Sequence, residues 1–263
     1  EEHSDQVAFM TASRLGQTVG VSESTVVRFA TEIGYSGYPA LQQAMQEMIR
    51  SKMTSVQRLE RTSRNIPADR LLDEVLDQDI DILKRTKENL DREAFYRTAD
   101  ALVGAKKVYV LGAGSSLALA TFLAHYLRLV FDTVHLVEAT SEATILQQMV
   151  RVGEGDAVIA ISFPRYSKKA VKTMKYASAQ KATTVAITDS PLSPLAQHAS
   201  HVLLARSDMV SFVDSLVGPL SIINALIVTV AIKKKDEVAD TLRKIEGIWD
   251  EYSVYEKVDE KGS

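Results

Sequence analysis

The middle of the chain alternates short apolar runs, rich in β-branched residues, with segments of helical length. Strand and helix alternating in this way build a parallel sheet through right-handed crossovers, with helices on both faces. Because the runs are apolar at nearly every position, we expect an α/β domain with a flavodoxin-like, parallel five-stranded sheet flanked by helices. The predicted strands are Lys107–Gly112, Thr133–Glu138, Asp156–Ser162, Thr183–Thr188 and His201–Ala205. The predicted connecting helices lie within Ser115–Phe131, Ser141–Arg151, Ser167–Gln180 and Ser193–His198.

Apolar residues recur at helical spacing on both sides of this region. Before it, we expect helices over Asp69–Leu90 and Arg92–Leu102. After it, Ser211–Ile232 is apolar on nearly all sides, so both flanks should be buried, with a partner subunit as one way to cover them. A last helix carries an apolar face made of Val238, Leu242, Ile245, Trp249 and Tyr252. We expect this face to pack against its own domain; a short seam with another subunit is the alternative.

The first part of the chain is helical in character and is punctuated by glycines. We assign residues 1–53 to a small all-α domain. Residues 54–67 are rich in Arg, Ser and Thr and are assigned to a linker with some helical character. Residues 68–255 form the α/β domain, and residues 256–263 form a tail. A chain of 263 residues fits this division into one small domain and one of ordinary size.

Residues 11–29 have the features of two short helices joined by a tight turn. Thr11 is placed to cap the first helix, and Ser22 is placed to cap the second. Gly16 gives the first helix a small face that a second helix can cross closely, and Gly20 supplies the turn. The pattern predicts a helix-turn-helix that reads DNA; a plain helical hairpin is the alternative.

On the second helix, Val26, Phe29 and Ile33 are spaced to face the core. This leaves a polar face near the helix N-terminus, the part of a recognition helix that enters the major groove. Hydroxyls bind base edges or phosphates, and arginine binds guanine through two hydrogen bonds. The candidate DNA-binding residues on this helix are Ser22, Glu23, Ser24, Thr25 and Arg28. In the segment that follows, the candidates for phosphate contacts are Tyr35, Ser36 and Tyr38.

Composition narrows the classes of function. The chain has no cysteine, which excludes disulfides, thiolate zinc sites and cysteine nucleophiles. Its longest apolar stretch, Leu216–Ile232, is shorter than the roughly 20 residues that a membrane span requires. We therefore expect a cytoplasmic protein without membrane contact. A net charge of −3 and a pI near 6.0 do not indicate strong nonspecific binding to nucleic acid. Sequence-specific binding of DNA by a dimer remains compatible with this charge.

The first predicted strand runs into a glycine-rich turn and then into a helix. Such a turn lets backbone N–H groups approach a phosphate, and the helix dipole favours the negative charge. We predict ligand contacts at Gly112, Gly114, Ser115 and Ser116, the alternative being a turn that only caps the helix. Leu117 stands where a dinucleotide-binding turn has its third glycine, so neither a nicotinamide nor any other cofactor is expected.

The string from Val21 to Phe29, followed by Gly34-Tyr35-Ser36-Gly37-Tyr38, closely resembles the helix-turn-helix of the RpiR family of bacterial transcription regulators. Members of that family carry a sugar isomerase (SIS) domain after it, and Asp69–Tyr255 resembles that arrangement. The resemblance implies a DNA-binding regulator of carbohydrate metabolism whose partners are operator DNA and a phosphosugar or other anionic sugar-derived effector. It also implies a homodimer or homotetramer. Because the family usually has a further helix before the motif, the resemblance implies a truncated N-terminus.

The resemblance adds a second loop to the candidate site. In SIS domains the third strand is usually followed by a Ser-x-Ser-Gly-x-Thr loop that wraps the phosphate of the ligand. Ser162 matches the first serine, and Ser167 stands in for the threonine. Pro164 and Arg165 replace the inner Ser-Gly, and the Arg165 guanidinium suits phosphate or carboxylate. Ser162, Arg165 and Ser167 are therefore candidate contacts for an anionic effector.

An SIS-type sugar-phosphate isomerase is the alternative function, because the SIS fold also serves such enzymes. Isomerisation needs a general base, and the candidates are Glu138, Glu142, His198 and His201. Their spacing pairs no base with an orienting residue, and a DNA reader precedes the domain. We therefore expect a regulator with no catalytic residue and no metal site.

Overall fold

The computed structural model describes residues 7–8, 10–42, 44–45, 54–209 and 211–255. The chain divides into two compact units, Glu1–Leu71 and Leu72–Ser263. The tail predicted at residues 256–263, the first six residues and the end of the predicted N-terminal domain lie outside the described residues.

The first unit is helical, as predicted. α2 (Ala12–Val19) and α3 (Glu23–Glu32) pack against each other. Their buried core consists of Val26, Ala30, Tyr38 and Leu41. The described part of this unit therefore has a hydrophobic core of its own.

The segment predicted as a linker is mostly helical. α5 (Ser55–Asn65) begins with a capping box, in which the Thr54 hydroxyl accepts from the Gln57 N–H and the Gln57 side chain accepts from the Thr54 N–H. The 3₁₀ turn η1 (Ala68–Arg70) follows. The predicted helical character of this segment is thus confirmed and extends over most of its length.

The second unit is built on a sheet whose strands are all parallel, in the order β2-β1-β3-β4-β5. This is the flavodoxin-like order, so the predicted fold class is confirmed. The strands, all predicted to within one residue at each end, are β1 (Val108–Gly112), β2 (Val134–Val137), β3 (Ala157–Ile161), β4 (Thr183–Thr188) and β5 (His201–Leu204). The helical elements are α6 (Leu71–Glu88), α7 (Arg92–Val103), α8 (Ser116–Leu127), α9 (Glu142–Met149), α10 (Lys168–Ala179), η2 (Ala196–His198), α11 (Val217–Lys233) and α12 (Lys235–Glu251).

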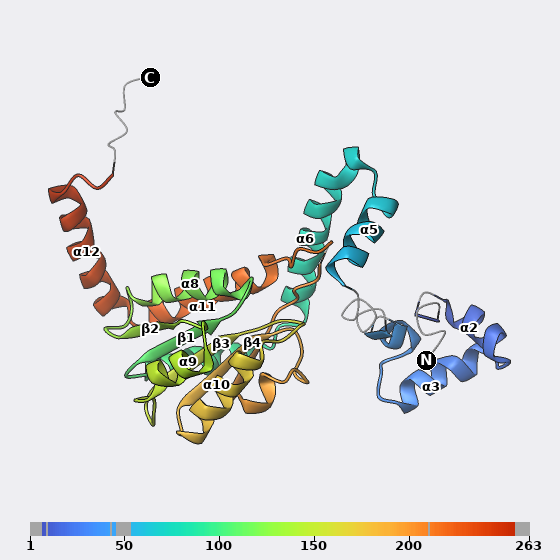
Figure 1. The fold of residues 1–263 in the computed structure, drawn as a ribbon, viewed down its shortest axis with the longest axis horizontal. Helices are drawn as coiled ribbons and strands as arrows, with labels where there is room; N and C mark the ends of the chain where they lie inside the picture. The colour runs from blue at the N-terminus through green and yellow to red at the C-terminus, as the bar shows by residue number, and fades with distance from the viewer. Residues whose placement is uncertain (1–6, 9, 43, 46–53, 210, 256–263) are drawn as a thin grey trace. The chain divides into compact units, whose positions relative to one another are not determined.

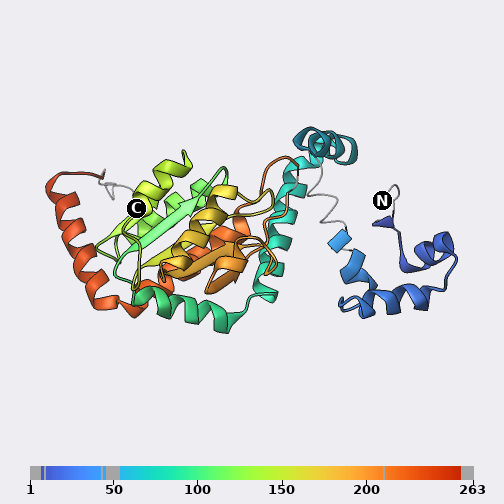
Figure 2. The ribbon, with the colours of Figure 1, turned by 60° about the horizontal axis from the view of Figure 1, so that its bottom comes forward.

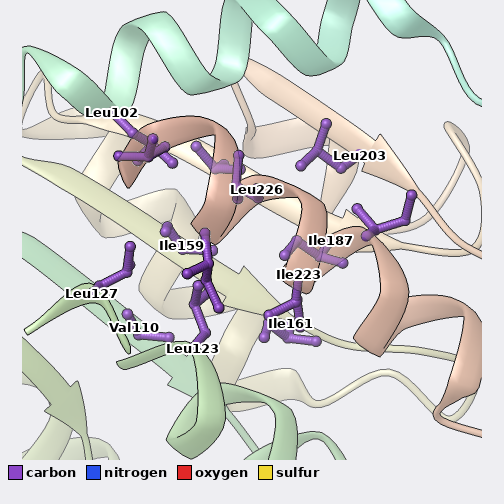
Figure 3. Packing of buried hydrophobic residues seen from close by; sticks show 14 of the residues in the cluster. Leu102, Val110, Leu123, Leu127, Ile159, Ile161, Ile187, Leu203, Ile223 and Leu226 are labelled. Carbon is purple, nitrogen blue, oxygen red and sulfur yellow. The ribbon is translucent and has the colours of Figure 1, made fainter. Parts of the chain in front are cut away.

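Helices cover both faces of the sheet (Figure 1). α7, α8 and α11 contribute to the core on one face, and α9 and α10 to the core on the other. Successive strand residues point to opposite faces, so that Ile159 enters the first core and Val158 the second. Figure 3 shows the first core, in which Ile223 and Leu226 of α11 and Leu123 of α8 gather around the strands. The central strands β1 and β3 are apolar throughout because both of their faces are buried in this way.

Gly218 lets three segments of the second unit meet. A Cβ on Gly218, in the first turn of α11, would lie 2.6 Å from the Arg206 carbonyl oxygen and 2.8 Å from the Thr86 Oγ1 on α6. Thr86 and its neighbour Ile82 are buried. The Arg206 N–H also donates to the Thr86 hydroxyl oxygen at 3.2 Å. The second half of α6 is therefore fixed to the sheet by a contact that has room only for glycine.

α12 makes an angle of 101° with α11 and projects away from the sheet layers in both Figure 1 and Figure 2. None of its residues is buried, and its contact with the core is made by Val238 in its first turn. The prediction that its apolar face packs on its own domain is therefore wrong, because the bend at Lys234 directs the rest of the helix outward. Leu242, Ile248 and Trp249 remain exposed.

The apolar pattern predicts that this helix begins at Ser211, but α11 begins at Val217. Pro219 lies in its first turn, where the missing N–H of proline removes no helical hydrogen bond, and the residues before it form a loop. One side of α11 is buried, whereas Val228 and Ile232 are exposed. In the described ranges, no single helix is long and apolar enough to cross a membrane; α11 and α12 pass that test only as a bent pair.

We expect Gly218→Ala to lower the free energy of unfolding by about 1–3 kcal/mol, because the added methyl group overlaps the backbone at the end of β5. Gly247→Ala in α12 is the matched control. Nothing lies within 4 Å of a Cβ at Gly247, and alanine stabilises a helix relative to glycine by up to about 1 kcal/mol. Denaturant titration followed by circular dichroism measures both. Equal changes in the two variants would contradict the tight junction.

Candidate functional site

The carboxyl ends of β1 and β3 lie side by side, because Gly112 pairs with Ile161. From these neighbouring strands the chain crosses in opposite directions, from β1 to β2 and from β3 to β4. The helices that follow, α8 and α10, therefore lie on opposite faces of the sheet. In open α/β sheets, ligands bind in the crevice at such a switch point. The two loops predicted from the sequence to contact a ligand are thus brought together.

The turn between β1 and α8 approaches its helix closely. A Cβ on Gly112 would meet the Ser116 carbonyl oxygen, and Gly114 has a φ of 61°, so both positions favour glycine. Ser116 is buried, whereas Ser115 is exposed. The Ser115 side chain does not cap α8; its hydroxyl donates to Asp214 Oδ2 at 2.6 Å. The surface hydroxyl of this turn is therefore that of Ser115, and it is held by a carboxylate.

The loop between β3 and α10 is held by its own serines. Ser162 is buried and its Oγ accepts from the Ser167 N–H at 3.1 Å, while the Ser167 side chain caps α10 by accepting from the Ala170 N–H. Arg165, in the middle of the loop, is exposed and has a φ of 66°. Left-handed backbone is uncommon for a residue with a side chain. Arg165 thus has a backbone conformation that suits glycine, and its side chain places a guanidinium on the loop.

Two further contacts brace this loop. The Tyr166 hydroxyl donates to Asp189 Oδ1, just after β4, at 2.9 Å. On the other side, Lys169 Nζ donates to the carbonyl oxygens of Ala139 and Thr140 at 2.8 and 2.7 Å. The β3–α10 region is therefore tied to the segment after β4 and to the segment after β2.

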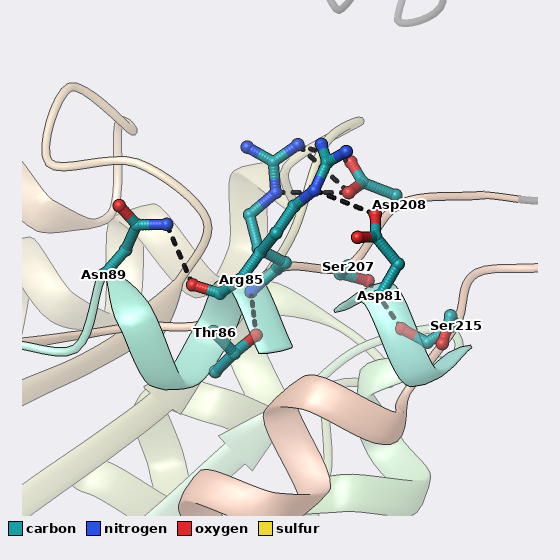
Figure 4. A network of polar contacts seen from close by, with 8 residues as sticks. Asp81, Arg85, Thr86, Asn89, Ser207, Asp208 and Ser215 are labelled. Carbon is teal, nitrogen blue, oxygen red and sulfur yellow. Dashed lines mark hydrogen bonds and ion pairs between the residues drawn. The ribbon is translucent and has the colours of Figure 1, made fainter. Parts of the chain in front are cut away.

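The loop between β5 and α11 contacts both the β1–α8 turn and α6. The Ser207 hydroxyl donates to the Ser215 carbonyl oxygen at 3.0 Å across the base of the loop (Figure 4). The Ser215 hydroxyl donates to Asp79 Oδ1 on α6 at 2.6 Å. The preceding residue, Asp214, is the one that holds Ser115. Two successive residues thus connect the candidate site with α6.

The candidate general bases lie in other parts of the domain. Glu138 and Glu142 are exposed after β2, and Glu142 pairs with Lys172 at 2.6 Å. His198 lies in η2. His201 opens β5 at the amino edge of the sheet, opposite the two loops, and burial together with a nearby arginine lowers its pKa below the usual value. None of the four lies in the β1–α8 turn or the β3–α10 loop.

In the first unit, α2 and α3 form the predicted helix-turn-helix. Thr11 caps α2 and Ser22 caps α3, each hydroxyl accepting a backbone N–H of its helix. Gly20 makes the turn with a φ of 74°. Gly16 is buried where the segments cross, and a Cβ there would lie 2.7 Å from the Val21 carbonyl oxygen. The local signals read from the sequence are thus confirmed.

Most of the predicted DNA contacts on α3 lie at the surface. The Ser22 hydroxyl lies 2.8 Å from those of Ser24 and Thr25, which groups three hydroxyls at the helix N-terminus. Glu23 occupies the first turn, where its charge suits the helix dipole. Arg28 lies one turn after Ser24 and is exposed, with a long ion pair of 3.7 Å to a glutamate on the same helix.

The core face of α3 differs from the prediction. The spacing predicts Phe29 and Ile33 in the core, but their exposed fractions are 54% and 47%. The core instead uses Ala30, which is fully buried four residues after Val26. A small residue at this position allows close packing against α2, which rotates Phe29 and Ile33 to the flank.

The predicted phosphate contact at Tyr38 is wrong. Tyr38 is only 3% exposed, and its hydroxyl donates to the Met10 carbonyl oxygen at 2.8 Å. Its ring completes the small core of this unit, where burial raises the pKa of its hydroxyl. Tyr35 and Ser36, the other two candidates in this segment, are exposed.

The sequence pattern misses the carboxylates that hold the two loops. Asp214 is 99 residues from Ser115 along the chain, and Asp189 is 23 residues from Tyr166. Asp189 has one usable signal, because it directly follows a strand at the carboxyl edge of the sheet. Asp214 lies in an irregular loop, and no pattern of spacing points to it.

Comparison with known families agrees with this architecture. Residues 1–52 match the model of the helix-turn-helix domain, rpiR family. Residues 101–229 match the model of the SIS domain. The two matches fall in the two units that the structure separates.

Three relatives illustrate the likeness. The sugar isomerase domain of an RpiR transcription factor from Sphaerobacter thermophilus is 31% identical, with a TM-score of 0.63 over 67% of this chain and 98% of that one. The NanR protein of Vibrio vulnificus, complexed with ManNAc-6P, is 21% identical, with a TM-score of 0.62 over 95% of this chain and 89% of that one. An uncharacterized HTH-type transcriptional regulator of Clostridium perfringens is 25% identical over 77% of this chain and 72% of its own.

Proposed function

The chain belongs to the RpiR family of transcriptional regulators, and from this premise we propose that its SIS domain binds an anionic, sugar-derived effector that controls DNA binding by the helix-turn-helix. The chain then binds operators of carbohydrate-metabolism genes in the bacterial cytoplasm, because the chromosome lies there.

The observation that carries this proposal is the meeting of two anion-binding features at the switch point between β1 and β3. On one side, the glycine turn leads into α8, whose dipole favours negative charge at its N-terminus. On the other side, the Arg165 guanidinium offers two parallel hydrogen bonds to a phosphate or carboxylate. NanR, which has the same fold, is complexed with a phosphosugar.

The same geometry supports a sensor without catalysis. The candidate bases lie outside the two loops, and His201 lies at the opposite edge of the sheet. A general base must come within hydrogen-bond reach of the proton that it removes. His201, at the amino edge of the sheet, is therefore out of reach of a sugar bound at the switch point.

The DNA contacts that we propose are the hydroxyls at the start of α3 and the exposed Arg28. The hydroxyls of Ser22, Ser24 and Thr25 lie together at a helix N-terminus, which suits a phosphate or a base edge. Arg28 supplies the charge and the bidentate geometry for guanine. The exposed Tyr35 and Ser36 suit phosphate contacts, which fix register without reading sequence.

A second copy of the chain completes this regulator. α12 projects from the domain with Leu242, Ile248 and Trp249 exposed, and its neighbour α11 exposes Val228 and Ile232. Large apolar residues gathered on one projecting helix favour a protein interface. Two copies would also supply the paired recognition helices that bind successive half-sites of an operator.

For the effector, we expect Arg165→Ala to weaken binding of the best phosphosugar in a thermal-shift screen by at least about tenfold, the scale of one hydrogen bond to a charged group. Arg165→Lys should restore only part of the affinity, because lysine keeps the positive charge but lacks the planar guanidinium that makes two parallel hydrogen bonds. Titration calorimetry measures both.

Arg165→Gly separates binding from backbone strain. We expect it to lose affinity yet gain stability, since glycine adopts positive φ without strain. Lys181→Gly, at another exposed turn residue with a φ of 62°, is the matched control and should gain stability with affinity intact. Unchanged affinity in all three Arg165 variants would remove Arg165 from the site.

For DNA, we expect Arg28→Ala to cost about 1–3 kcal/mol on the preferred operator and to relax selectivity at one base pair. Selection from a random DNA library identifies the operator, and fluorescence anisotropy compares the variants. Arg64→Ala on α5, another exposed arginine in a loose ion pair, is the control and should keep the base preference. An unaltered preference in Arg28→Ala would rule out base reading by this residue.

For assembly, we expect the wild-type chain to be at least a dimer at micromolar concentration and the double variant Leu242→Glu, Trp249→Glu to be a monomer. Light scattering after size exclusion measures the mass. Arg243→Glu with Lys244→Glu changes exposed polar positions on the same helix and should keep the oligomer. A monomeric wild type, or an oligomer that survives the apolar-face variant, would exclude α12 as the interface.

A further inference from the structure

The hydroxyl of Ser115 is already occupied in the described structure. It donates to the Asp214 carboxylate at 2.6 Å, at the start of α8. A serine hydroxyl carries one proton and can donate to only one acceptor at a time. An effector oxygen that takes this proton must therefore displace Asp214. An anionic group brought to the same helix end would also be repelled by the Asp214 carboxylate.

The residue after Asp214 is tied in another direction. The Ser215 hydroxyl donates to Asp79 on α6 at 2.6 Å, and its backbone N–H donates to the Asp208 carbonyl oxygen at 3.2 Å. Because Asp214 and Ser215 are adjacent, a shift of the backbone at Asp214 is passed directly to Ser215. The candidate site and α6 are thus linked through two adjacent residues.

α6 is attached to the domain at two places of different character. Its second half is fixed by the buried Ile82 and Thr86 against Gly218, a contact made of packed atoms. The attachment at Asp79 is a hydrogen bond to the half-buried Ser215. Before Asp79, α6 exposes Leu72 and Leu76 and continues along the chain into the DNA-binding unit.

We propose that Asp214 acts as a built-in competitor for the effector: it holds Ser115 in the free protein, and the anionic group of the effector displaces it. Displacement moves Ser215 and releases Asp79, so that the first half of α6 is freed while the contact at Thr86 persists. This proposal rests on the proposed function, since it assigns a regulatory role to the same site. Asp214 is thus a positioning residue that couples occupancy of the site to the helix leading to the DNA reader.

The first experiment tests competition, with inorganic phosphate as the probe at constant ionic strength. We expect Asp214→Asn to lower the half-saturating phosphate concentration about tenfold, because the charge that opposes the anion is gone. Asp208→Asn is the matched control, since it removes a carboxylate from the same loop that pairs with Arg206 and not with Ser115. An equal effect in both variants, or no gain in Asp214→Asn, would overturn the competition.

The second experiment tests the link to α6 by hydrogen exchange with mass spectrometry. In the wild type, saturating phosphate should raise deuterium uptake over residues 72–80 and leave residues 82–86 unchanged. Ser215→Ala should show the raised uptake without phosphate and no further response to it, while still binding phosphate. Merely structural loosening would raise uptake in both segments, and this result, like an unresponsive wild type, would overturn the link.

The failures are distinguishable. If neither phosphate nor any phosphosugar binds to the wild type or to Asp214→Asn, the effector site itself is wrong and this proposal falls with it. If a phosphosugar binds in an Arg165-dependent manner but Asp214→Asn leaves its affinity unchanged, the proposed function stands and only the role of Asp214 is refuted.

Discussion

The register between β1 and β3 is the constraint on which the rest of the second unit depends. Pairing of Gly112 with Ile161 makes the chain leave both strands at the same level. Since the next crossovers run in opposite directions, the two loops lie side by side at the carboxyl edge of the sheet, where open α/β sheets bind ligands. A slip of one residue would turn every strand side chain to the opposite face, which the two buried cores forbid. The apolar packing that stabilises the sheet therefore also positions the site.

Backbone conformation defines both loops more than side-chain identity does. Gly112 leaves space for the start of α8, and Gly114 turns the chain with positive φ. On the other side, Arg165 has a φ that glycine adopts freely, and such a conformation persists only where the surroundings hold it. Here the bond from the Ser167 N–H to Ser162 closes the loop from inside. Arg165 thus carries its side chain on a backbone conformation that suits glycine.

Sequence reasoning succeeds where the determining physics is local. Strands such as β1 and β3, which are buried on both faces, form continuous apolar runs in the sequence, and helix caps such as Ser22 need only a few neighbouring residues. The core face of α3 is different, because the rows that contain Phe29 and Ala30 are both apolar and the partner surface decides between them. The contact between Ser115 and Asp214 spans 99 residues, and only the fold brings them together.

The charges of these loops restrict the chemistry of the proposed effector. The start of α8 and Arg165 favour an anionic group, whereas Asp214 is an acceptor that repels further negative charge nearby. A ligand that carries negative charge along its whole length would be attracted by the start of α8 and by Arg165 but repelled by the Asp214 carboxylate. A ligand with an anionic group at one end and hydroxyl donors along its length suits both, because a carboxylate displaced from Ser115 can accept from those hydroxyls. That combination describes a sugar acid or a phosphosugar better than it describes a simple inorganic anion, and under the proposed assignment Asp214 contributes to that discrimination as much as Arg165 does.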